Sequence, residues 1–241
     1  MPSDAGSIDE RLQQIWHDSA QKRMPLPTEL ELATALGASR PMVREALVRM
    51  EADGLIARRA HQGTFPNVSA LSIPFRIDQS YELTARLTES GLDVSVDVVS
   101  GEWSTLTADE AHDLQLEEGA SCFRVVKRWC ADGEPLILAE DVVPARRRDD
   151  VDFPDDYSVF DIVDRLRGAV VEWESASLRP VLPSASDQEL LSVGDREPLL
   201  AITLVGVSLH GDRLFRAYEL HTSRGPEYGM VRRAPAHVRQ R

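Results

Sequence analysis

The sequence predicts an α+β protein in two parts, a small helical part at the N-terminus and a larger part built around an antiparallel sheet. Within residues 8–50, apolar residues recur every three to four positions, which is the spacing of amphipathic helices. From residue 94 onward, short apolar runs alternate with polar residues, and Asp132-Gly133 separates two runs as a hairpin turn would. Helical segments lie between the predicted strands, so the second part is a mixed α+β domain.

The best-defined helix spans about residues 39–53. Its buried face has four apolar residues at helical spacing: Val43, Ala46, Leu47 and Met50. Ser39 precedes it as an N-cap, and Asp53-Gly54 ends it. Arg40 and Arg44 lie one turn apart on its exposed N-terminal half, where guanidinium groups could bond the O6 and N7 atoms of guanine. A basic helix taken alone is more often a solvated surface helix, so the neighbouring segments decide between the two interpretations.

Two further helices precede this one. The first, at about 8–21, carries Ile8, Leu12, Ile15 and Trp16 and ends before Met24-Pro25-Leu26-Pro27, since proline cannot continue a helix. Thr28-Glu29-Leu30-Glu31 is a capping box that opens the second, with Leu30, Ala33 and Leu36 expected inside and Gly37 at its end. Only Gly37-Ala38 separates the second helix from the third, which is the short turn of a helix-turn-helix.

A predicted hairpin follows the third helix. Residues 55–59 and 64–65 read as short strands around a glycine-containing tip at 60–63. This tip, with Arg58, Arg59 and His61, could enter a minor groove or hold phosphates. Three helices followed by such a hairpin form a winged helix, and DNA binding then becomes the favoured interpretation of the third helix.

The distribution of charge is consistent with this interpretation. The net charge of −13 at first argues against a nucleic-acid partner. However, residues 1–67 carry 8 basic and 9 acidic side chains, whereas the rest carries 19 and 31, so most of the excess acid lies outside the winged helix. The sequence shows no apolar run of membrane-spanning length and no secretory signal, and we expect a cytoplasmic protein whose two cysteines, Cys122 and Cys130, are reduced.

Residues 24–66 resemble the GntR family of bacterial transcription regulators, through Leu26-Pro27-Thr28-Glu29, Leu36-Gly37-Ala38-Ser39-Arg40, Val43-Arg44-Glu45-Ala46-Leu47, Asp53-Gly54-Leu55-Ile56 and Gln62-Gly63-Thr64-Phe65. The resemblance implies a homodimer on double-stranded operator DNA of two-fold symmetry, with GT/AC half-sites. It implies that Arg40 and Arg44 read bases, that Gly63 approaches the minor groove, and that Thr28 and Ser39 lie near phosphates. Pro41 departs from the family, which more often has a small polar residue there. The predicted DNA-binding residues are Thr28, Glu29, Ser39, Arg40, Arg44, Arg49, Arg58, His61, Gln62, Gly63 and Thr64.

The predicted domains are a winged helix at 1–67, a linker at 68–79 and an α+β domain at 80–241. Strands are expected around 94–98, 123–129, 136–142, 170–178, 199–209 and 214–222, with helices at about 80–90, 107–117, 158–167 and 186–193. Two capping boxes, beginning at Thr107 and Ser186, each precede a helix, a strand, a hairpin and a second strand. Glu140 and Glu219 fall at the same offset from these caps, so an internal repeat is favoured over chance similarity.

This order of elements resembles the UTRA effector-binding domain of the HutC subgroup, whose fold is shared with chorismate lyase. The supporting stretches are residues 111–116 with Gly119, Ala131-Asp132-Gly133-Glu134-Pro135, Val142-Val143-Pro144, Ser158-Val159-Phe160 and Arg224-Gly225. The main competing GntR effector domain is an all-helical bundle with a metal site, and the alternating valines and hairpins argue against it. We expect the domain at 80–241 to bind an effector and to dimerise.

The resemblance also implies where an effector would bind. In the subgroup, phosphorylated sugars are held by helix N-termini, a serine, an arginine pair and acidic residues on strands. In this chain the arginine pair is replaced by Lys127 and Trp129, and the subgroup's glutamates align with Ala139 and Ala217. These departures favour a different small metabolite, one that is anionic or bears an aromatic ring. The predicted effector-binding residues are Leu83, Thr84, Lys127, Trp129, Glu140, Ser158, Glu219 and Arg224.

These features predict a DNA-binding transcriptional regulator, most often a repressor in this family, whose operator affinity responds to a small-molecule effector. We expect no catalytic residue, no metal, no cofactor and no membrane partner. Two alternatives remain: a C-terminal domain that only dimerises, and a chorismate lyase-like enzyme. The sequence lacks nucleophile-elbow, phosphate-loop and metal-ligand spacings, which makes the enzyme the weaker alternative.

Overall fold

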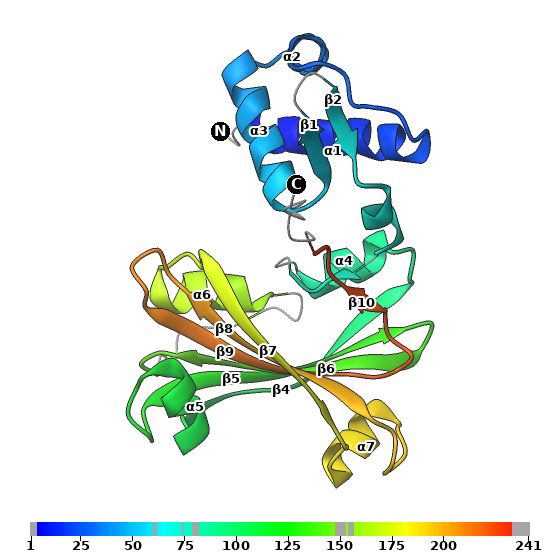
Figure 1. The fold of residues 1–241 in the computed structure, drawn as a ribbon. Coiled ribbons are helices and arrows are strands. Elements are labelled where there is room, and N and C mark those ends of the chain that lie inside the picture. Colours follow the sequence, from blue (N-terminus) through cyan, green and yellow to red (C-terminus); the bar gives the residue numbers. More distant parts are fainter. Residues whose placement is uncertain are drawn as a thin grey trace, which may run out of the picture. The chain divides into compact units, whose positions relative to one another are not determined.

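The computed structural model describes residues 4–59, 62–73, 75–78, 82–147, 153 and 157–232. These residues form two compact units: one within Met1–Gln79 and Glu227–Arg241, the other within Ser80–Pro226. Figure 1 shows the elements of each unit.

The first unit contains the predicted winged helix. It consists of α1 (Asp4–Gln21), α2 (Glu29–Leu36), α3 (Arg40–Ala52) and the antiparallel strands β1 (Ile56–Arg59) and β2 (Gly63–Pro66). The capping box of Thr28 with Glu31 and the N-cap of Ser39 are both present, and Gly37 ends α2 with a φ of 65° in the left-handed region. The four apolar residues predicted to face inward from α3 are all buried. The predicted helix-helix-helix-hairpin order is therefore confirmed.

The prediction that Leu30 is buried in this unit is wrong. Leu30 is 60% exposed, whereas Leu32, Ala33 and Leu36 are buried. At 3.6 residues per turn, Leu30 lies more than 90° around α2 from the centre of the face formed by these three residues. The short helix turns that face toward the core, so Leu30 remains outside.

The segment after the wing has structure of its own. It includes a 3-10 helix, η1 (Val68–Ser72), and strand β3 (Phe75–Arg76), which pairs in parallel with β10 (Tyr228–Gly229) near the end of the described chain. η1 contacts α1, and buried Ala70 joins the core of the winged helix. The domain boundaries at 67, 79 and 80 stay a prediction.

The second unit is built on a six-stranded antiparallel sheet in the order β4-β5-β6-β9-β8-β7. Its strands are β4 (Val94–Thr105), β5 (Ser121–Ala131), β6 (Glu134–Pro144), β7 (Trp173–Val181), β8 (Leu199–Val207) and β9 (Arg213–His221). Its helices are α4 (Leu83–Glu89), α5 (Ala108–Leu114), α6 (Val159–Arg167) and α7 (Ala185–Leu191). The predicted hairpin is confirmed: Asp132 and Gly133 connect β5 to β6 with φ values of 50° and 80°.

The strand order agrees with the predicted internal repeat. β4-α5-β5-β6 and β7-α7-β8-β9 each run from a sheet edge to the centre, where β6 pairs with β9. The helix of each half packs on a strand of the other half: α5 contacts β9, and α7 contacts β6. The predicted cap of α7 is wrong by two residues. The hydroxyl of Ser184, not Ser186, accepts from the backbone of Asp187, so the matching offsets of Glu140 and Glu219 do not reflect equivalent positions.

The two faces of this sheet are covered by different helices. α5 and α7 pack on one face, against residues that include Val142 and Leu220. α6 packs on the other face through Ile162 and Val163, against Phe123, Phe215 and neighbouring residues. Figure 1 shows α6 on the opposite side of the sheet from α5 and α7. We call these the α5/α7 face and the α6 face.

Candidate functional site

The exposed side of α3 carries a charge cluster that links three elements of the winged helix. Arg44 of α3 donates to Glu29, the first residue of α2, with Nη2 to Oε2 at 2.8 Å and Nε to the same carboxylate at 3.3 Å. Arg58 of β1 donates to the other oxygen of Glu29 at 2.9 Å. The hydrogen bond from Arg44 lowers the pKa of Glu29. This group brings together three of the predicted DNA-binding residues.

The remaining predicted DNA-binding residues have different settings. Arg40 is exposed, and no hydrogen bond or ion pair joins it to the described part of the chain. Arg49 instead pairs with Asp9 of α1, at 2.8 Å. Thr28 and Ser39 hold the starts of α2 and α3 through their hydroxyl groups.

Of the predicted wing tip at 60–63, the structure describes residues 62 and 63. Gly63 has a φ of 105°, in the region that favours glycine, and a Cβ atom there would meet no atom of the described residues within 4 Å. The carbonyl of Thr64 accepts from Leu26, at 2.8 Å, while Gln62 is exposed. His61, at the tip itself, lies outside the described residues.

The α6 face of the sheet contains a buried polar cluster. Lys127, Asp141, Glu219 and His221 are all buried and point from β5, β6 and β9 to this face. Lys127 and Glu219 lie in one row on either side of Ala139. The Nε2 atom of His221 lies 2.9 Å from a carboxylate oxygen of Glu219.

Burial and the charge of Glu219 raise the pKa of Asp141 to about 7, while Lys127 opposes this shift. The Asp141 carboxyl group therefore titrates near neutral pH, whereas an ordinary aspartate is already ionised there.

A cavity lies beside this cluster, between α6 and the β4–β5 edge of the sheet. Its volume is about 330 Å³, within the range of small-molecule pockets. Four aromatic residues, Trp103, Phe123, Phe153 and Tyr157, form much of its wall through successive ring contacts. Lys127 is the basic side chain that lines it. The cavity thus combines an aromatic wall with one basic residue, Lys127, and one acidic residue, Glu102.

The N-terminus of α4 contributes predicted effector residues to the same face. The Nε1 atom of Trp129 donates to the hydroxyl of Thr84 at 3.0 Å, and Trp129 is buried. Leu83 begins the helix, and the carboxylate of Glu82 accepts from the amides of Thr84 and Ala85, at 3.0 and 2.7 Å. These two amides are therefore already bonded within the protein.

The N-terminus of α6 is occupied in the same way. One carboxylate oxygen of Asp161 accepts from the backbone amide of Ser158 at 2.9 Å and from its hydroxyl at 2.6 Å. The hydroxyl of Ser158 in turn accepts from the amide of Asp161 at 3.2 Å. Ser158 is thus a capping residue beside the cavity residue Tyr157.

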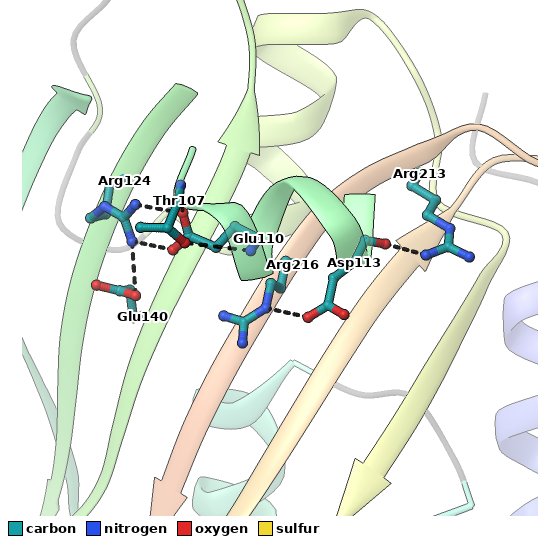
Figure 2. A network of polar contacts seen from close by, with 7 residues as sticks. All are labelled: Thr107, Glu110, Asp113, Arg124, Glu140, Arg213 and Arg216. Carbon is teal, nitrogen blue, oxygen red and sulfur yellow. Dashed lines mark hydrogen bonds and ion pairs between the residues drawn. The ribbon is translucent and has the colours of Figure 1, made fainter. Parts of the chain in front are cut away.

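Two predicted effector residues do not lie with the others. Glu140 points to the α5/α7 face, where it pairs with Arg124 at 2.8 Å (Figure 2). A shift of one residue along a strand turns a side chain to the opposite face, which is why Ala139 and Glu140 are not interchangeable. Arg224 follows β9 and bonds Glu134 and the carbonyl of Leu191.

The sequence analysis missed Asp141 and His221. Both follow the two-residue period of a strand, since Asp141 shares a face with Ala139, and His221 shares a face with Glu219. The alternation of faces along β6 and β9 could have identified them, because the resemblance to the HutC subgroup aligns Ala139 with a glutamate that binds the effector.

The α5/α7 face has a charged network of its own, in which arginines of β5 and β9 bond residues of α5 and β6. Arg124 bonds Glu110 of α5 at 2.7 and 2.9 Å as well as Glu140. Arg216 binds the carboxylate of Asp113 at 2.8 Å, and Arg213 donates to the carbonyl of the same residue (Figure 2). These contacts fasten α5 to the sheet.

Comparison with known proteins identifies both units. Residues 89–224 match the model of the UTRA domain, and residues 7–65 match that of the bacterial regulatory proteins of the gntR family. The chain belongs to the gntR family and carries a UTRA domain. This gntR-family protein is a DNA-binding regulator of transcription whose second unit is of an effector-binding type.

Individual relatives agree with this assignment. The HTH-type transcriptional repressor NagR of Bacillus subtilis is 23% identical over 221 residues, which cover 90% of this chain and 88% of NagR. The HTH-type transcriptional repressor PhnF of Mycolicibacterium smegmatis is 28% identical over 75% of this chain and 73% of its own. The structure of a possible regulator, YydK of Bacillus subtilis, shares the fold with a TM-score of 0.74 at 13% identity, covering 96% of this chain and all of that one.

Within the described part of the gntR-family chain, no helix has the length and apolar character needed to cross a membrane. The same residues contain no group of three His, Cys, Asp or Glu side chains arranged to hold a metal ion.

Proposed function

We propose that this regulator is a cytoplasmic repressor that binds a two-fold symmetric operator with GT/AC half-sites as a homodimer and is released by a small-molecule effector. The observation that carries the DNA-binding part is the pair of exposed arginines, Arg40 and Arg44, on the first turns of a capped helix that precedes a two-stranded wing. Guanidinium groups in this position can reach base edges in a major groove. The regulators among its relatives support this function and give no support to a catalytic one.

The homodimer is supported by an apolar edge of the sheet. β7 is an edge strand, and Val170, Trp173, Leu178 and Leu182 along it or at its ends are exposed by 46–75%. A sheet edge with exposed apolar side chains is suited to association with a second copy of the chain. Measurement of the mass in solution tests this part, and a monomer at micromolar concentration would contradict it.

We further propose that the effector binds in the cavity on the α6 face and carries no phosphate group. The amides that could hold a phosphate at α4 and the hydroxyl at α6 are occupied by the carboxylates of Glu82 and Asp161, which would also repel a dianion. The aromatic wall instead favours a ring-bearing molecule with at most one negative charge, toward which the cavity lining presents the positive charge of Lys127.

The DNA-binding proposal is tested with Arg44→Ala in the full chain. We expect operator affinity to fall about 10- to 100-fold and preference at one base position to relax, because one bidentate base contact is lost. Fluorescence anisotropy with labelled duplexes gives both quantities. Arg196→Ala removes the same charge from an exposed residue of the second unit and serves as the control. Unchanged discrimination by Arg44→Ala would show that α3 does not read the operator.

The effector proposal is tested by adding metabolites to the protein–operator complex. Benzoate, phenylacetate and indole-3-acetate represent ring-bearing carboxylates, and glucosamine 6-phosphate and glucose 6-phosphate represent phosphorylated sugars. Release by a member of the first group is expected. Release by a sugar phosphate alone would contradict the proposed chemistry, and operator binding that no metabolite shifts would support a C-terminal domain that only dimerises.

A further inference from the structure

Glu29 contacts two arginines of the proposed DNA-binding surface, Arg44 and Arg58. Glu29 lies at the start of α2, and its side chain is only 20% exposed, whereas that of Arg44 is 59% exposed. The carboxylate therefore contacts the inner side of the Arg44 guanidinium group, and the outer end of that group stays exposed. Arg58 of the wing strand bonds the same carboxylate, so its two oxygens serve α3 and β1 together.

The geometry of Arg44 allows it to bind Glu29 and a guanine at the same time. A guanidinium group has five N–H donors in a fixed planar arrangement. Glu29 takes the Nε–H and one hydrogen of Nη2, which form one edge of the group. The end formed by Nη1 and Nη2 keeps the hydrogens that a bidentate contact to O6 and N7 requires.

Glu29 also changes the charge that Arg44 and Arg58 present to DNA. Without it, two positive charges at this surface would attract the phosphates of any duplex, since phosphate attraction supplies most non-specific affinity. One carboxylate between them leaves a net charge of +1 for the group.

We infer that Glu29 is a specificity-determining positioning residue: it orients Arg44 toward a guanine and reduces the attraction of Arg44 and Arg58 to the phosphates of other DNA. This inference rests on the proposed operator binding and assigns a role within it. Glu29 acts through the two arginines and needs no contact of its own with a base.

The test compares Glu29→Gln with Glu31→Gln in the full chain. Both variants remove one negative charge from the first turn of α2, but Glu31 contacts Thr28 and bonds no arginine in the part of the chain that the structure describes. Glutamine is also compatible with the capping box at position 31, so the control keeps the helix start. Affinities for an operator and for a scrambled duplex are measured by anisotropy at several salt concentrations.

For Glu29→Gln we expect tighter binding to scrambled DNA, a steeper dependence of affinity on salt, and a ratio of operator to scrambled affinity about tenfold lower. The salt slope should increase by up to about 1, the change for roughly one additional phosphate contact. Glu31→Gln should leave the ratio within about twofold of the wild type, well below the tenfold effect that corresponds to about 1.4 kcal/mol.

A double-mutant cycle separates a positioning role from a purely structural one. If Glu29 acts through Arg44, then Glu29→Gln should lose most of its effect on base preference in the Arg44→Ala background. Equal effects of Glu29→Gln in both backgrounds, or equal ratios for Glu29→Gln and Glu31→Gln, would overturn the inference. Failure of the wild type to distinguish the operator from scrambled DNA would instead contradict the proposed function.

Discussion

Glu140 and Asp141 are neighbours on β6, yet they belong to opposite faces of the sheet and to different kinds of site. Glu140 joins Arg124 and Glu110 in a network in which the charges are paired. Asp141 lies on the α6 face, where burial and Glu219 raise its pKa to about 7. The α5/α7 face thus uses its charges to hold a helix, whereas the α6 face keeps a titratable carboxyl group beside a cavity. The difference indicates that the first face serves stability and that the second is suited to binding.

The largest expected effect comes from breaking the paired network with Arg124→Met. This change leaves Glu110, whose side chain is 6% exposed, without its main partner. Removing one member of a buried ion pair costs about 3–5 kcal/mol, because the remaining charge stays buried. We expect the urea midpoint of the sheet unit, followed by tryptophan fluorescence, to fall accordingly. Arg128→Met is the control, since Arg128 pairs with Asp97, which is 50% exposed, and should cost about 1 kcal/mol or less. Similar losses for both variants would show that the Arg124 network is not specially stabilising.

A second expected effect concerns the other face and depends on pH. The pKa of Asp141 is about 7 in the folded chain but about 3.9 for an unperturbed aspartate, so the unfolded chain loses this proton first as the pH rises. The contribution of Asp141 to the free energy of unfolding is therefore fully present below about pH 4 and falls as the pH rises to about 7. The loss amounts to at most about 4 kcal/mol, at about 1.4 kcal/mol per pKa unit.

Asp141→Asn should remove this dependence, so the variant should gain stability relative to the wild type as the pH rises from 4 to 7. Urea unfolding at a series of pH values measures the difference. A difference that is independent of pH would mean that the pKa of Asp141 is the same in the folded and the unfolded chain, which would contradict the raised pKa.

The smallest expected effect is that of Glu140→Gln. Its side chain is 35% exposed and Arg124 retains Glu110, so we expect a loss of about 1 kcal/mol or less. The loss should vary little with pH over the range in which Asp141→Asn responds. A pH response as large as that of Asp141→Asn would remove the contrast between the two faces.

Sequence patterns predicted the winged helix almost completely, because the signals that define it are local. The capping residues Thr28 and Ser39, the glycine that ends α2 and the buried face of α3 each depend on residues within about two helical turns. Leu30 is the exception, since the face that a short helix buries is chosen by its neighbours in space.

The effector site was predicted less well, because it is assembled from strands that are distant in the chain. Lys127, Trp129 and Glu219 were expected at the site and do lie on one face of the sheet. Glu140 was not brought there, and Asp141 and His221 were missed, because register and face depend on strand pairing. The two-residue error at the start of α7 has a local cause: Ser184 and Ser186 are both reasonable caps, and the reciprocal bonds between Ser184 and Asp187 begin the helix two residues earlier.

The sequence by itself therefore determined the two-part α+β organisation, the order of the elements and the presence of arginines on the third helix. These follow from hydrophobic periodicity, capping and turn residues, which act over a few positions. Only the tertiary structure decided that one carboxylate, Glu29, holds Arg44 and Arg58, and that Asp141 rather than Glu140 faces the cavity side of the sheet. Such contacts join residues far apart in the chain, and their geometry arises only when the elements pack together.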